Sequence, residues 1–116
     1  MSVFQIILIL FTVLLLSVGQ ILFKLASNDI VLTVDGLLPS LLSFKLLIAF
    51  AVYSGATVLW LIALKDVPLR AAYPFAALAF FLVPTLAHFL LGEPLGWNTY
   101  IGASIIAFGV IISVSK

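Results

Sequence analysis

Four long runs of apolar residues, separated by short polar connections, take up almost the whole of this 116-residue chain. A helix that crosses a membrane needs ~20 mostly apolar residues, so four such runs and their connections fill the available length. Five Lys and Arg and four Asp and Glu make up only 8% of the chain, whereas a soluble globular domain carries roughly 25% charged residues. The sequence therefore predicts an all-α integral membrane protein, a single domain built as a four-transmembrane-helix bundle.

Residues that interrupt helices mark the ends of the four spans. The connection between residues 27 and 40 is the longest and leans polar, because Asn, Asp, Gly and Pro recur in it. Tight connections at 65–68 and 92–96 follow the second and third runs. Residues 1–4 lack the positively charged n-region of a signal peptide, so we expect the first run to be retained as a span. We expect the four helices at about residues 2–26, 41–64, 69–91 and 97–114.

The charge balance excludes several classes of function. A formal charge of +1 provides no basic surface for a nucleic acid, so no nucleic-acid partner is expected. The chain has no Cys, one His and scattered carboxylates, and it contains no metal-ligand pair, glycine-rich phosphate loop or catalytic spacing motif. We therefore expect no metal, no cofactor and no enzymatic activity.

The basic residues give a small orientation signal. Four spans place both termini on one side of the membrane, together with Lys65, Arg70 and Lys116, while Lys24 and Lys45 lie on the other side. Cytoplasmic segments carry an excess of Lys and Arg, so this bias favours cytoplasmic termini. Three residues against two is also a small enough margin to permit insertion in both orientations.

The first span carries a polar face near one membrane surface. Ser17, Gln20 and Lys24 are separated by three and four residues, so they lie on one side of a helix. Polar side chains are costly in hydrocarbon, and each therefore requires a reason. One interpretation is that Lys24 and Gln20 bind an anionic headgroup. The alternative is that Lys24 extends to the interface while Gln20 bonds a neighbouring helix. Lys45 lies one turn inside the second span, where its stem can likewise run along apolar surface while its ammonium reaches the interface.

The third span carries a second stripe of interest. Within an arc of roughly 80° on the helix, small or polar side chains alternate with aromatic rings. The stripe consists of Arg70, Tyr73, Ala77, Phe80, Pro84 and His88. Such a stripe is suited to line a path for an amphipathic molecule, although ordinary helix packing also explains its small and aromatic members. Pro74 and Pro84 each remove a backbone hydrogen bond, so with Gly92 they are the candidate hinges.

The fourth span and the turn before it complete the set of candidates. Gly102 and Gly109 lie one heptad apart, and Ser113 follows Gly109 at the spacing of small residues that lets helices approach closely. We expect these three residues to form a dimer interface. Glu93 lies in the turn, either as a solvated charge or as a gate that contacts a headgroup.

These positions resemble a known family along nearly the whole chain. The matching residues are Gly19, Gln20, Lys24, Trp60, Val67, Pro68, Ala72, Tyr73, Pro74, Glu93, Pro94, Gly102 and Gly109. They are similar to the small four-helix members of the drug/metabolite transporter superfamily (small multidrug resistance-like, EamA-like), and most of all to the subunits that flip aminoarabinose-phosphoundecaprenol in bacteria. The resemblance implies a bacterial inner-membrane flippase subunit that moves a polyprenyl-phosphate-linked sugar. It also implies a homodimer, or a heterodimer with a similar small subunit.

Within this hypothesis, Lys24 and Lys45 neutralise the phosphate, Gln20 and Tyr73 contact the sugar, and Glu93 guards the outer mouth. The identity of the sugar stays open. A second hypothesis is export of hydrophobic cations, but Leu16 stands where the small multidrug resistance exporters have their embedded glutamate. A third is a non-transporting membrane partner of a glycosyltransferase.

Overall fold

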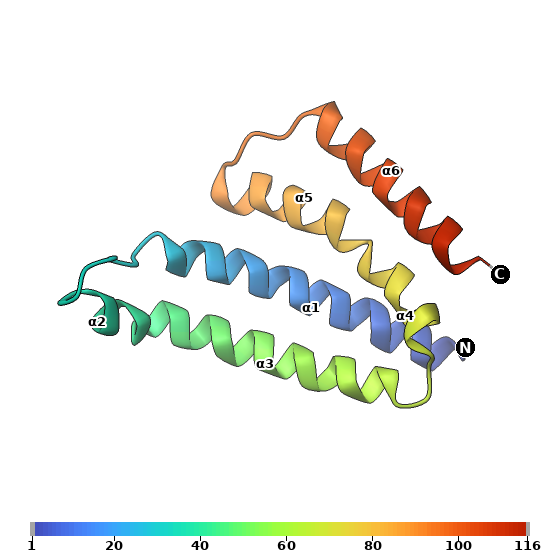
Figure 1. Cartoon of the computed structure of the whole chain (residues 1–116), viewed down its shortest axis with the longest axis horizontal. Coiled ribbons are helices and arrows are strands. Elements are labelled where there is room, and N and C mark those ends of the chain that lie inside the picture. The colour runs from blue at the N-terminus through green and yellow to red at the C-terminus, as the bar shows by residue number, and fades with distance from the viewer. Residues whose placement is uncertain (1, 116) are drawn as a thin grey trace.

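The computed structural model describes residues 2–115 and contains helices without strands in this part of the chain (Figure 1). The predicted all-α membrane fold is confirmed, because two helices and the 69–91 segment are long and apolar enough to cross a membrane, and a fourth, shorter apolar helix follows. The elements in chain order are α1 (Val3–Ser27), α2 (Leu37–Leu41), α3 (Phe44–Leu64), α4 (Leu69–Ala76), α5 (Ala79–Leu91) and α6 (Trp97–Val114).

Serine side chains begin the two longest helices. At the start of α1, the Ser2 hydroxyl accepts a hydrogen bond from the Gln5 backbone N–H at 3.2 Å, and the Gln5 side chain accepts one from the Ser2 N–H at 2.9 Å. This reciprocal pair satisfies two backbone donors that a helix otherwise leaves unpaired. Ser43 caps α3 in a similar way by accepting from the Leu46 N–H. The second span therefore begins at Phe44, and the residues just before it form the separate short helix α2.

Helix α1 lies at the centre of the bundle (Figure 1). It packs along α3 on one side and against α4 and α5 on the other, while α6 packs on α4 and α5. Both ends of the described chain lie at the same end of the bundle as the turn between α3 and α4 (Figure 1). The radius of gyration is 16.4 Å, whereas a compact domain of this length would have about 13 Å. The helices therefore form an extended array with large faces left open to lipid.

Small side chains hold α1 and α3 together. Ala49, Ala56 and Ala63 recur every seven residues along α3, and each is almost fully buried. From α1, Gly19 comes so close to Tyr53 that an added Cβ atom would lie 3.0 Å from the tyrosine Cδ2 atom. Membrane helices associate through such close approach, since lipid removes the hydrophobic drive between them. The α1–α3 pair is accordingly the most tightly packed part of the fold.

The third span consists of two helical pieces instead of one. Helix α4 ends at Ala76 and α5 begins at Ala79. In the turn between them the hydrogen bonds span three residues instead of four, from the Ala77 N–H to the Pro74 carbonyl at 3.2 Å and from the Leu78 N–H to the Phe75 carbonyl at 3.1 Å. Pro74 has no N–H and crowds the carbonyl of Arg70 one turn earlier, so its direct effect falls within α4 and not on the break that follows it. Pro84, by contrast, lies inside an uninterrupted α5.

Candidate functional site

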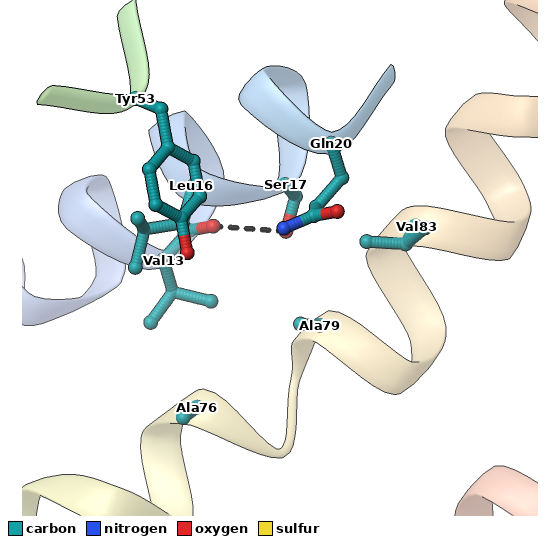
Figure 2. Close-up of a pocket in the computed structure, with 8 residues that line it drawn as sticks. All are labelled: Val13, Leu16, Ser17, Gln20, Tyr53, Ala76, Ala79 and Val83. Carbon is teal, nitrogen blue, oxygen red and sulfur yellow. Dashed lines mark hydrogen bonds between the residues drawn. The ribbon is translucent and has the colours of Figure 1, made fainter. Parts of the chain in front are cut away.

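The polar face of α1 forms the floor of a groove between α3 and the α4–α5 pair, which we call the α1 groove. Val13, Leu16, Ser17 and Gln20 line this floor beside a cavity of about 180 Å³. The buried Ser17 hydroxyl donates to the Val13 carbonyl at 2.8 Å and is therefore satisfied within α1. The Gln20 amide extends into the space between the helices (Figure 2). Of the two, Gln20 is the group that presents both a donor and an acceptor to a ligand.

Helix α3 contributes an aromatic wall to the groove. Tyr53, Thr57 and Trp60 are four and three residues apart, so they lie on one face of the helix. The Tyr53 ring is held from behind by Phe23, with ring centroids 5.3 Å apart. This wall borders a cavity of about 400 Å³, within the ~300–1,000 Å³ range of small-molecule sites. The residues that line it are Leu16, Tyr53, Thr57, Trp60, Tyr73 and Ala76.

The opposite wall comes from both sides of the break between α4 and α5. Ala76, Ala79 and Val83 face Tyr53 and Gln20 across the cavity (Figure 2). Ala76 and Ala79 flank the break, so the irregular backbone lies beside open space. Non-helical backbone at membrane depth occurs where it is buried in protein or lines a cavity. The interruption in the third span therefore belongs to the groove.

The stripe predicted on the third span lines a further cavity in part. Tyr73, Ala77 and Phe80 border a space of about 160 Å³ together with Val110 of α6. Tyr73 is 58% exposed and lines both this space and the 400 Å³ cavity. The middle of the stripe thus extends the α1 groove toward α6.

The basic candidates lie around the groove. Lys24 is exposed and follows Gln20 by one turn on the same face of α1, at the end of the groove floor. The Lys45 ammonium lies 3.0 Å from the Asp29 carboxylate, an exposed ion pair that joins the two ends of the α1–α3 connection. Arg70 is exposed at the start of α4, toward the other end of the bundle. None of these three lines the cavities of the groove.

His88, Gly92 and Glu93 build the turn between α5 and α6. The His88 Nδ1 atom lies 2.8 Å from the Glu93 backbone oxygen, and because a carbonyl only accepts, Nδ1 carries the hydrogen. Gly92 has φ +73°, a left-handed conformation that ends α5 and favours glycine. The turn keeps these residues away from the cavities that Gln20 and Tyr73 line.

The residues that line the three cavities carry no formal charge. They offer the Gln20 amide, the hydroxyls of Ser17, Thr57 and two tyrosines, the Trp60 indole and aliphatic surface. Within residues 2–115, no group of three His, Asp or Glu side chains lies close enough to hold a metal ion. The groove is thus suited to a neutral polar molecule with apolar faces.

Comparison with known proteins decides the family. No family model and no solved structure matches the chain. A probable 4-amino-4-deoxy-L-arabinose-phosphoundecaprenol flippase subunit ArnF of Shewanella sediminis is 33% identical over 132 aligned positions, which cover 100% of this chain and 91% of the relative. The chain belongs to the ArnE/ArnF family of flippase subunits.

Two further relatives support this membership. The probable flippase subunit ArnF of Erwinia tasmaniensis is 32% identical over 87% of each chain. The probable ArnE subunit of Pseudomonas savastanoi is 31% identical over 84% of this chain and 85% of its own length. The predicted resemblance to these subunits is confirmed, and the chain is a multi-pass membrane protein of the ArnE/ArnF family.

Proposed function

We propose that this protein is a subunit of a bacterial inner-membrane flippase that translocates a polyprenyl-phosphate-linked sugar. The observation that carries the proposal is the α1 groove, an uncharged space with amide, hydroxyl and aromatic groups inside a membrane-spanning bundle. Membership of a family whose members are named as flippase subunits supports it. The activity is transport, not a chemical reaction.

The sugar headgroup occupies the α1 groove. Gln20 exchanges hydrogen bonds with sugar hydroxyls, and the Thr57 hydroxyl, which donates to the Tyr53 carbonyl, accepts one. Tyr53, Trp60 and Tyr73 add ring faces that pack on the apolar face of a sugar and polar atoms that bond its rim. A hydroxyl-bearing headgroup in hydrocarbon is costly when its hydrogen bonds are unmade. The groove supplies those partners and thereby lowers the barrier to crossing.

The phosphate binds at the end of the groove, and the prenyl tail stays in lipid. Lys24 lies one turn beyond Gln20, so it can meet a phosphate while the sugar contacts Gln20. Lys45 is held by Asp29 at 3.0 Å, and it contributes to the phosphate only by exchanging that partner. Arg70, His88 and Glu93 lie at or near the membrane surfaces, where they meet the headgroup as it enters or leaves.

Two protomers complete the transporter, either identical or paired as similar small subunits. The interface is α6, where Gly102 and Gly109 have open space beside them and Ser113 is exposed. Small residues at such spacing let a second helix approach closely. The ArnE and ArnF names of the relatives denote two kinds of subunit, which favours the paired arrangement.

Alternating access uses the break in the third span. The irregular backbone at Ala77–Leu78, Pro74 just before it and the left-handed Gly92 at the end of α5 provide the bending points. Pro84 lies in a continuous helix and contributes less than Pro74. The termini face the cytoplasm, in line with the distribution of basic residues.

Export of hydrophobic cations is less well supported. Leu16 lines the groove at the position where the small multidrug resistance exporters carry a glutamate. An aliphatic side chain binds neither a proton nor a cation, so exchange of one for the other has no acceptor there.

The test is transport of a labelled polyprenyl-phosphate sugar by vesicles that contain the protein, alone or with its partner subunit. We expect Lys24→Ala to slow the flux by about tenfold to a hundredfold, because a charge-assisted hydrogen bond contributes roughly 1.5–3 kcal/mol. Lys65→Ala, which removes an exposed lysine in the α3–α4 turn, is the matched control and should leave the flux unchanged.

Two results would contradict the proposal. Equal flux for both lysine variants would remove the phosphate role of Lys24. A parent protein that moves no lipid-linked sugar but forms a stable complex with a glycosyltransferase would instead support the membrane-partner hypothesis.

A further inference from the structure

The connection between α1 and α3 is ordered by its own hydrogen bonds. The Thr33 hydroxyl accepts from the Gly36 N–H at 3.0 Å, and the Thr33 carbonyl accepts from the Leu37 N–H at 2.9 Å. Ser40 ties the two ends together, because its hydroxyl accepts from the Val31 N–H and donates to the Leu37 carbonyl. Residues 31–42, here called the leucine loop, therefore have a fixed shape that includes α2.

The leucine loop nevertheless exposes large apolar side chains. Leu32 is 85% exposed and Val34 98%, and the other exposed members are Val31, Leu37, Leu38, Leu41 and Leu42. The three leucines of α2 and the C-cap residue Leu42 fall on one arc of the helix, opposite Pro39 and Ser40. No residue of α2 is buried, and the loop projects beyond the end of the α1–α3 hairpin (Figure 1). The sequence pattern had indicated a polar-leaning connection, and the structure shows an amphipathic one.

We propose that the leucine loop is a membrane-interface anchor, with its leucines in the boundary between lipid headgroups and acyl chains. A connection in water would hide these side chains, whereas the bilayer surface accepts an apolar face on one side and polar groups on the other. The surface is continuous with the lipid-facing start of α3, where Phe44 is 77% exposed and Leu47 51%. The occupant that this continuity identifies is the same bilayer that surrounds α1 and α3.

The position of the loop gives the anchor a consequence for the groove. The loop joins the end of α1 that carries Lys24 to the start of α3, and the Lys45–Asp29 ion pair spans the same junction. Insertion of its leucines fixes how deep this junction lies in the membrane. Lys24 is thereby held at the level of lipid phosphates.

Single-cysteine variants of the full chain test this directly, since the sequence has no cysteine of its own. A nitroxide label at Leu38→Cys is compared with labels at Leu61→Cys and Asp66→Cys in vesicles of phosphatidylethanolamine and phosphatidylglycerol. Leu61 is the matched control for Leu38, because it is 62% exposed against 66% for Leu38 but lies within the α3 span. Asp66 lies in the α3–α4 turn and reports water.

We expect the label at residue 38 to collide more often with oxygen than with a water-soluble nickel complex, as at residue 61, and the label at residue 66 to show the reverse. A nickel accessibility at residue 38 as high as that at residue 66 would overturn the proposal and place the loop in water. Low accessibility of residue 38 to both reagents would also overturn it, because protein would then cover the loop. The label at residue 61 verifies insertion, so neither outcome arises from a protein that failed to fold.

Discussion

The buried residues Ala49, Ala56 and Ala63 of α3, here called the alanine seam, give the sharpest prediction for stability. Ala56 has 0% exposed surface on the face of α3 that packs against α1, and Ala56→Leu adds three carbon atoms there. Overpacking of a close-packed site costs about 1–3 kcal/mol. A loss in this range lowers the ratio of folded to unfolded protein by roughly tenfold. The matched control is Ala51→Leu, the same change on an exposed position of α3, where the added carbons enter lipid.

The assay is unfolding of purified protein by SDS in mixed micelles, followed by tryptophan fluorescence. Trp60 packs against the core cluster of the bundle, so its emission reports loss of the α1–α3 packing. We expect Ala56→Leu to unfold at a clearly lower SDS fraction than the parent. Ala51→Leu should change the free energy of unfolding by less than about 0.5 kcal/mol. If Ala56→Leu and Ala51→Leu unfolded at the same SDS fraction, the alanine seam would not hold the helices together and our account of the fold would be wrong.

Three further predictions follow from backbone geometry and charge. Gly92→Ala should destabilise the protein by about 1–2 kcal/mol in the same assay, because its φ of +73° is unfavourable for a residue with a Cβ atom. Gly19→Ala should reduce lipid flux by displacing the Tyr53 ring, whose Cδ2 atom would lie 3.0 Å from the new Cβ, whereas Gly55→Ala meets nothing within 4 Å and should transport normally. Lys45→Gln should cost less than about 1 kcal/mol, a loss that salt diminishes, since its ion pair is exposed.

The spans were predictable because the physical requirement for them acts on every residue. Hydrocarbon accepts long apolar helices, and the fourth run, expected at 97–114, coincides with α6. The break at Ala77–Leu78 was harder to predict from the sequence, because Pro74 and Pro84 give the same signal and only Pro74 lies near an interruption. Periodicity also identifies the face of a helix but not the helix that it meets, so the central place of α1 came from the structure alone.

The candidate site was predicted in part. Gln20 and Tyr73 line the α1 groove, since the cost of polar groups in hydrocarbon singled them out. The same reasoning missed Tyr53 and Thr57: the Thr57 hydroxyl bonds the Tyr53 carbonyl at 2.9 Å, and a hydroxyl satisfied within its own helix requires no special explanation. The ion pair of Lys45 with Asp29 could not be predicted either, because Asp29 precedes Lys45 by sixteen residues and no local spacing rule relates them.

The central place of α1 bears on how the chain assembles during synthesis. Of the helices described, α1 is made before the others and is also the one against which α3, α4 and α5 pack, while α6, made after them, joins only α4 and α5 extensively. Each new helix thus finds its neighbours already in the bilayer, and none must be inserted between two that have already met. A nascent chain that stops before α6 still contains every helix that borders the 400 Å³ cavity.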